Sequence, residues 1–135
     1  MAELPDKITR WFAAKGWSLR AHQHAMIEKA QAGRSALLIA PTGAGKTLAG
    51  FLPSLIDLMA PRPVRRLHTL YISPLKALAV DVARNLETPA AEMGLPIRIE
   101  ARTGDTPASR RTRQMTSPPD ILLTTPEQLA LMLAH

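Results

Sequence analysis

Hydrophobic positions along the chain fall into short periodic segments that glycine and proline separate. Helical spacing of the apolar residues predicts a helix over 5–15, ended by Gly16, and a second helix over 20–32, ended by Gly33. Trp17, which follows the first helix, is expected to pack in the core. No segment approaches the roughly 18 consecutive apolar residues that a membrane span needs, so no membrane partner is expected.

Strand-like and helix-like patterns alternate after the second helix. Residues 35–40 form a short apolar run that is typical of a strand buried on both faces. Further strands are expected over 67–73, 97–101 and 120–125, and helices over 46–59, 75–87, 107–115 and 126–134. This alternation predicts an α/β fold in which helices cover both faces of a parallel sheet.

The composition is that of a globular protein with a basic surplus. The 135 residues include 17 Lys and Arg against 11 Asp and Glu, which gives a net charge of +6, and the length suits one domain. A surplus of this size fits a nucleic-acid partner, but it is also common among other soluble proteins. The absence of cysteine excludes disulfides and thiol nucleophiles, and no secretory signal is visible, so a cytoplasmic location is expected.

A phosphate-binding loop lies between the predicted strand over 35–40 and the helix that follows it. The loop has the general pattern, with alanine in place of the first glycine. Backbone N–H groups at the start of a helix attract phosphate, Lys46 is expected to reach the β- and γ-phosphates of ATP, and Thr47 is expected to bind Mg²⁺. A chance match in a strand–turn–helix connection is the alternative. The expected nucleotide-binding residues of the loop are Ala40, Pro41, Thr42, Gly43, Ala44, Gly45, Lys46 and Thr47, of which Lys46 and Thr47 are the expected catalytic residues.

Four segments resemble the motifs of superfamily 2 helicases. Gln23, which stands 17 residues before Ala40, is similar in its setting to the adenine-sensing glutamine of the Q motif. The other likenesses are SPLKALA at 73–79 to motif Ia, RTGDT at 102–106 to motif Ib, and TTPEQL at 124–129 to motif Ic. Together these variants resemble the large-helicase-related (Lhr) group of DExH-box enzymes over about residues 8–134, with the bacterial ligase-associated DExH-box DNA helicases as the nearest likeness.

The resemblance implies the first RecA-like domain of an ATP-dependent DNA helicase or translocase. ATP and Mg²⁺ would be its cofactors, DNA its substrate, and DNA-repair proteins its further partners. Gln23 would hold the adenine edge with its amide, although an exposed helix glutamine is the alternative. Trp17 could lie against the base instead of in the core. Thr125 would also cap the last helix. The residues that would bind the nucleic-acid backbone are Ser73, Pro74, Leu75 and Lys76, then Arg102, Thr103 and Gly104, and finally Thr124, Thr125 and Pro126.

Two basic clusters lie outside these motifs. Arg110, Arg111 and Arg113 form the denser one, and the other consists of Arg62, Arg65 and Arg66. Either cluster could line a path for nucleic acid, whereas a solvated surface is the more common explanation of such clusters.

The acidic pair that a phosphate-loop ATPase uses for Mg²⁺ and the attacking water does not occur, because no two acidic residues are adjacent in the sequence. By resemblance, residues 1–135 are expected to be one partial helicase ATP-binding domain, in which residues 1–33 carry the N-terminal helices and the Q-motif-like glutamine. The strand with the DExH motif and the second RecA-like domain are expected to be absent. The chain alone is therefore expected to bind ATP–Mg²⁺ weakly and to be inactive, with poor solubility because strand edges are left unpaired.

Two other functions fit parts of the pattern. A non-catalytic module that binds nucleic acid or nucleotide would keep the phosphate loop without hydrolysing ATP. A small phosphotransferase would also use the loop, although such enzymes usually carry it close to the N-terminus.

Overall fold

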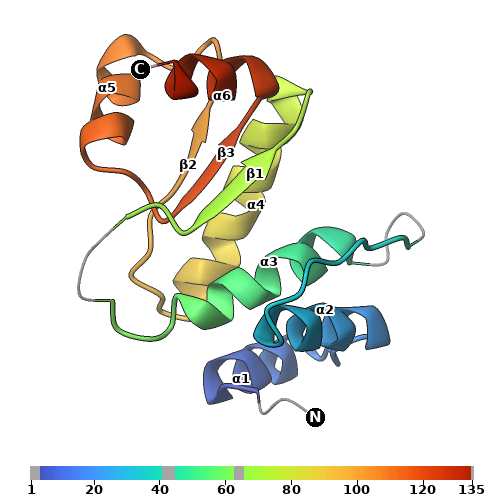
Figure 1. Ribbon diagram of the computed structural model, residues 1–135. Helices are drawn as coiled ribbons and strands as arrows, with labels where there is room; N and C mark the ends of the chain where they lie inside the picture. Colours follow the sequence, from blue (N-terminus) through green and yellow to red (C-terminus); the bar gives the residue numbers. More distant parts are fainter. Residues whose placement is uncertain (1–3, 41–44, 63–65, 135) are drawn as a thin grey trace. The chain divides into compact units, whose positions relative to one another are not determined.

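The computed structural model describes residues 4–40, 45–62 and 66–134 (Figure 1). The chain divides into two compact units, Met1–Ala60 and Pro61–His135. Within the described ranges, no helix is long and apolar enough to cross a membrane.

The first unit consists of three helices: α1 (Asp6–Lys15), α2 (Ala21–Gln31) and α3 (Lys46–Asp57). The apolar positions of α1 are buried, as predicted, and Gly16 ends the helix with a left-handed φ of 72°. Helices α2 and α3 pack against each other. The core of this unit includes Ile8, Phe12, Ile27, Leu52 and Leu55.

Trp17 does not pack in the core as predicted, because 54% of its surface is exposed. Its ring meets the rings of Trp11 and Phe12 edge-on, with centroids 5.5 and 6.5 Å apart. Trp11 and Phe12, two of the buried residues of α1, thus cover part of the indole, and the rest of its surface stays exposed.

The prediction of a buried strand over residues 35–40 is also wrong. Residues 34–40 have no regular secondary structure, and Leu37 and Ile39 are 85% and 84% exposed. A buried strand needs a neighbour that satisfies its backbone N–H and C=O groups, and no strand in the described part of the chain pairs with this segment. The apolar composition alone therefore does not bury it.

The second unit is built on a parallel sheet of three strands in the order β1–β3–β2. The strands are β1 (Thr69–Ile72), β2 (Ile99–Arg102) and β3 (Ile121–Thr124). They are connected and followed by α4 (Lys76–Glu92), α5 (Ala108–Thr116) and α6 (Pro126–Leu133). The predicted strands and helices of this region are confirmed, with small differences at their ends.

Helices cover both faces of this sheet, which confirms the predicted α/β class. Helix α4 packs on β2 and β3 and crosses behind the sheet in Figure 1. On the other face, Gln114 of α5 contacts Glu100, and Gln128 of α6 contacts Arg102. Side chains alternate along a strand, so Glu100 and Arg102 share this second face.

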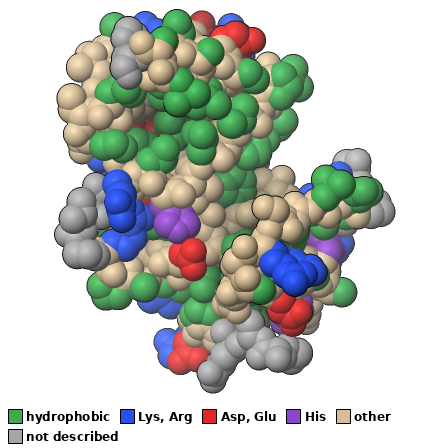
Figure 2. Space-filling model, in the orientation of Figure 1, with side chains coloured by type: hydrophobic (Ala, Val, Ile, Leu, Met, Phe, Trp, Pro, Cys, Tyr) green, Lys and Arg blue, Asp and Glu red, His purple; other side chains and the backbone are tan. Residues whose placement is uncertain are grey.

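Burial on both faces holds for the central strand only. All of β3 is buried, whereas β1 alternates between half-buried and exposed positions. Leu70 and Ile72 pair in register with Leu122 and Thr124, yet both are exposed because β1 lies at the edge of the sheet. Figure 2 shows hydrophobic side chains gathered over this part of the second unit.

Two helix boundaries show which local signals decide them. Helix α4 continues to Glu92, beyond the predicted end at 87 and through Pro89, because Ala90 extends its buried stripe. Helix α6 begins at Pro126, and the hydroxyl of Thr125 accepts the backbone N–H of Gln128 as a cap at 3.5 Å.

Candidate functional site

The N-terminus of α3 is the described part of the predicted phosphate loop. Gly45 precedes the helix with a φ of 76°, and Lys46 is its first residue. The first N–H groups of a helix have no partner within it, so they form a site for an anion. The side chains of Lys46 and Thr47 are exposed at this end. The predicted ligands Pro41, Thr42, Gly43 and Ala44 lie outside the described residues.

Gln23 lies beside this helix start. It is only 4% exposed, so it is not the exposed helix glutamine that the sequence analysis left as the alternative. Its Oε1 accepts the backbone N–H of Arg20 at 2.9 Å, which fixes the amide at the beginning of α2. A Cβ atom on Gly45 would lie 2.9 Å from its Nε2, so only glycine fits there without moving the amide. Two segments that the sequence pattern pairs with ATP are thus brought together.

A hollow of about 490 Å³ adjoins these residues. Its walls combine an aromatic ring from Trp17, the amide of Gln23 and the backbone of Gly45. The complete lining is Phe12, Gly16, Trp17, Ser18, Arg20, Gln23, Gly45 and Leu48. An exposed ring beside an amide suits a flat heterocycle, because the ring offers a stacking surface and the amide offers both a donor and an acceptor.

The three predicted nucleic-acid motifs follow the three strands of the second unit. Because the strands are parallel, their carboxyl ends meet at one edge of the sheet, where ligands bind in such sheets. The strand order places the turn after β3 between the turns after β1 and β2, so the motifs follow one another as Ia, Ic and Ib.

Polar bonds tie the three turns to one another. The backbone N–H of Ser73 donates to Thr124 O at 2.9 Å, and Thr124 Oγ1 donates to Arg102 O at 2.7 Å. Across the surface, Lys76 Nζ lies 3.1 Å from Asp105 Oδ2. The spacing between the turns is therefore fixed by short contacts rather than by the turns alone.

The predicted residues at this edge divide into buried and exposed sets. The buried side chains are those of Ser73, Arg102, Thr103, Thr124 and Thr125, and the exposed residues are Pro74, Leu75, Lys76, Gly104 and Pro126. The buried hydroxyls hold the turns in shape: Asp105 N donates to Thr103 Oγ1 at 3.2 Å, and Leu75 N donates to Ser73 Oγ at 3.2 Å. Exposed backbone and Lys76 are the groups that solvent, or a phosphate, can reach.

Arg102 is the predicted residue whose position differs most from expectation. It is 7% exposed, and its Nε donates to Gln128 Oε1 at 3.2 Å. Burial and the nearby charge of Arg111 both lower the pKa of its guanidinium. The side chain thus lies below the exposed surface of the edge, and its partner Gln128 belongs to the motif Ic segment without being one of the predicted nucleic-acid-binding residues.

Glu100 holds α5 against the sheet through a network that the sequence analysis also missed. Its carboxylate accepts Arg98 Nη2 at 2.9 Å and Gln114 Nε2 at 3.1 Å, and Arg113 Nη2 lies 3.9 Å away. Burial raises the pKa of Glu100, but the bonds from Arg98 and Gln114 and the charges of Arg98 and Arg113 outweigh it, so the pKa is lowered. The signal for this network in the sequence was an acidic residue between two arginines, Arg98 and Arg102, at the strand.

No cluster of three or more His, Asp or Glu side chains that could hold a metal ion is found among the described residues. Thr47 is the one predicted Mg²⁺ ligand, and its exposed side chain lies at the start of α3. A hydroxyl at that place fits a metal that a bound nucleotide would share.

Comparison with known proteins identifies the family. The family model for the DEAD/DEAH box helicase matches residues 20–135. The chain belongs to the DEAD/DEAH box helicase family. The resemblance to the Lhr group is confirmed by curated relatives: the "Lhr helicase/ probable uracil glycosylase" of Mycolicibacterium smegmatis is 50% identical over 113 residues, and the "Lhr helicase/uracil glycosylase" of Escherichia coli is 44% identical over 154 residues.

Those alignments cover 75% and 96% of this chain, but only 8% and 10% of the relatives. The chain thus spans about a tenth of the length of these curated relatives. The nearest likeness within the group, to the ligase-associated helicases, stays a prediction.

Solved helicase structures share the fold. "Mycobacterium smegmatis helicase Lhr bound to ssDNA and AMP-PNP" superposes with a TM-score of 0.86 at 40% identity, covering 97% of this chain and 18% of that one. The "DUF1998 helicase MrfA bound to DNA and AMPPNP" gives 0.83 at 30% identity, covering 96% and 18%. These matches confirm the RecA-like helicase fold of the predicted class.

Proposed function

We propose that this chain provides the ATP-binding and nucleic-acid-binding elements of the first RecA-like domain in an ATP-dependent DNA helicase or translocase. The proposal rests above all on the closeness of Gln23 Nε2 to Gly45, 2.9 Å from where a Cβ would lie. An amide that can bind a base and a helix start that can bind phosphate then lie directly beside each other.

In this proposal the nucleotide occupies the hollow of the first unit. Gln23 reads the adenine edge, Trp17 stacks on the base, and the phosphates meet the N–H groups at the start of α3. Lys46 neutralises the β- and γ-phosphates. Thr47 contributes its hydroxyl to Mg²⁺, which would supply charge neutralisation at the transferring phosphate. The loop residues from Ala40 to Ala44 complete the cradle.

The nucleic acid would cross the carboxyl edge of the sheet in the second unit. Exposed groups at Pro74, Leu75, Lys76, Gly104 and Pro126 contact its backbone, and free N–H groups at the start of α4 attract its phosphates. The buried members of the three motifs keep the turns in place. Such contacts position a strand without reading its sequence.

Binding to DNA rather than RNA is part of the same proposal, and it is supported by the similar helicases whose structures were solved with ssDNA or DNA bound. Work in DNA repair with protein partners, in the cytoplasm, is the wider setting that we propose. ATP hydrolysis by the whole enzyme is also part of the proposal, and it is supported by curated relatives such as the "ATP-dependent helicase Lhr-Core" of Methanocaldococcus jannaschii.

The nucleotide site is tested by Lys46→Ala. We expect this variant to lose measurable binding of a fluorescent ATP analogue while its circular dichroism and thermal midpoint stay unchanged, because Lys46 is exposed. Lys29→Ala, an exposed lysine on α2, is the matched control and should bind as the wild type does. Equal binding by the wild type and Lys46→Ala would show that the loop is not the site. Tight DNA binding that is indifferent to ATP would instead favour a non-catalytic module.

A further inference from the structure

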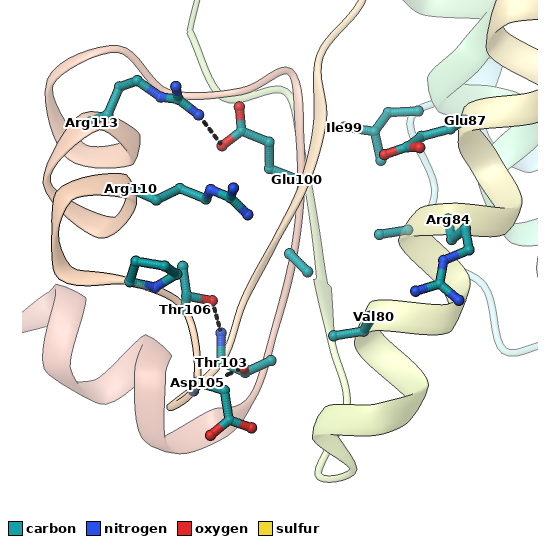
Figure 3. Close-up of a pocket in the computed structure, with 13 residues that line it drawn as sticks. Val80, Arg84, Glu87, Ile99, Glu100, Thr103, Asp105, Thr106, Arg110 and Arg113 are labelled. Carbon is teal, nitrogen blue, oxygen red and sulfur yellow. Dashed lines mark hydrogen bonds and ion pairs between the residues drawn. The ribbon is translucent and has the colours of Figure 1, made fainter.

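A groove of about 420 Å³ lies beside the free edge of β2 (Figure 3). Strand β2 is the last strand of the sheet, so one of its edges has no neighbouring strand among the described residues. Helix α4 forms one wall with Arg84 and Glu87, and helix α5 forms the other with Arg110 and Arg113. The turn over 103–107 closes one end.

The arginines of the groove are available to a ligand. Arg84 and Arg110 are exposed, and neither makes an ion pair or hydrogen bond among the described residues. Arg113 is 3.9 Å from Glu100 and has 59% of its side chain exposed. Figure 3 shows Arg110 reaching from α5 toward the strand and Arg84 standing on α4 across from it.

Most of the acids in the groove are already engaged. Arg98 and Gln114 both donate to the carboxylate of Glu100. Asp105 pairs with Lys76 at 3.1 Å. Within the described residues, Glu87 is the acid of this lining that has no such partner. The unpaired charges of the groove are therefore mainly positive and favour an anion.

The groove continues the edge proposed to carry nucleic acid. Its closed end is the motif Ib turn, since Thr103, Asp105 and Thr106 belong to both. Motif Ib is also the last of the three turns along the edge, because β2 is the outer strand. A strand that passes over Ia, Ic and Ib in turn therefore reaches the mouth of the groove when it leaves the sheet.

We propose that this groove binds the phosphodiester backbone of the same single strand beyond the motif Ib turn, with Arg84, Arg110 and Arg113 as phosphate ligands. The inference rests on the proposed nucleic-acid function. It adds a second segment to the binding track, at the side of the sheet rather than on its carboxyl edge. It also assigns a role to two of the three residues in the basic cluster around position 111.

Oligonucleotide length separates the groove from the edge. Fluorescence anisotropy of the full chain with oligo(dT) of about 6 and about 12 nucleotides covers the range of usual single-strand sites. In Arg84→Gln/Arg110→Gln we expect about tenfold weaker binding of the longer oligonucleotide, with the shorter one unaffected. The slope of log affinity against log salt should shrink by about 1.4, since each lost phosphate contact removes about 0.7.

The control variant Arg10→Gln/Arg34→Gln removes the same charge from the first unit and should leave the length dependence unchanged. Glu87→Gln removes the unpaired acid and should tighten binding of the longer oligonucleotide by about two- to threefold. All these side chains are exposed, so thermal midpoints should match the wild type.

The outcomes distinguish this inference from the function on which it rests. Equal affinity of the wild type and the Arg84/Arg110 variant for the longer oligonucleotide would overturn the proposed groove site and leave the proposed site on the carboxyl edge unaffected. An equal loss of affinity for the shorter and the longer oligonucleotide would place Arg84 and Arg110 on the carboxyl edge itself, and would also overturn the proposed groove site. Failure of the wild type to bind either oligonucleotide would overturn the nucleic-acid function and the groove together.

Discussion

Residues 35–40 and strand β3 are both short and largely apolar, yet their surroundings are opposite. Leu37 is 85% exposed, whereas Leu123 is 0% exposed. Strand β3 has a hydrogen-bonded neighbour on each side, and α4 packs against it. No described strand pairs with residues 35–40. The difference shows that an apolar run acquires a buried place only when other strands satisfy its backbone.

The difference between β3 and residues 35–40 is tested most strongly by changing one leucine to aspartate in each segment. Leu123→Asp places a charge at a fully buried position, so we expect a loss of about 4 kcal/mol or more in the free energy of unfolding, enough to unfold a marginal unit. Leu37→Asp should change that free energy by less than about 0.5 kcal/mol. Urea titration followed by circular dichroism measures both. A large loss from Leu37→Asp would mean that residues 35–40 are buried in solution.

Lowering the pH tests whether the hydrogen bonds and ion pairs of Glu100 on β2 stabilise the sheet that contains β3. The pKa of Glu100 is lowered in the folded state, so its stabilisation is present above its unfolded value, near 4.5, and is lost as the pH falls through the lower folded value. Glu100→Gln should cost about 1–3 kcal/mol at neutral pH, because Arg98 loses a charged partner. It should also flatten the fall in the urea midpoint below pH 4.5.

Glu28→Gln, on the exposed face of α2, is the control for this titration. It should keep both the neutral stability and the acid dependence of the wild type. An unchanged acid dependence in Glu100→Gln would show that another carboxylate is responsible.

A smaller effect is expected at the end of β3. Thr124→Val keeps the shape of a fully buried side chain but removes the hydroxyl that donates to Arg102 O. We expect a loss of about 1–2 kcal/mol in the free energy of unfolding, because a buried carbonyl oxygen loses a donor. Thr116→Val, whose hydroxyl bonds helix carbonyls at an exposed position, should cost less than about 0.5 kcal/mol. Equal losses would mean that the bond across the sheet adds nothing specific.

Local signals were enough to predict most elements of the fold. Gly16 ends α1 through a positive φ, and Thr125 with Pro126 starts α6, and each of these depends only on neighbours along the chain. The burial of residues 35–40 was predicted wrongly, because burial depends on partners far away in sequence. The burial of Trp17 was predicted wrongly for a similar reason, because it depends on the path of the chain after Gly16.

The candidate site shows the same division. The approach of Gln23 to Gly45 follows from motif spacing, and the parallel sheet brings the three turns to one edge. The partner of Arg102 was not predicted, since Gln128 lies 26 residues away and, although it stands in the motif Ic segment, it is not among the residues expected to bind nucleic acid. The groove beside β2 was hidden for the same reason, because Arg84 and Arg110 come from separate helices.

The crowding at Gly45 has a consequence for the design of loop variants. A methyl group there would meet the Gln23 amide at 2.9 Å, in a backbone conformation that L-residues rarely adopt. Gly45→Ala would therefore disturb the proposed base site and the proposed phosphate site at once, and a weakened affinity for ATP could be assigned to neither. Lys46 has no such second role, so it is the cleaner position for separating the choice of base from the hold on the phosphates. A substitution at Gly45 thus affects both proposed contacts together, whereas a substitution at Lys46 affects the phosphate contact alone.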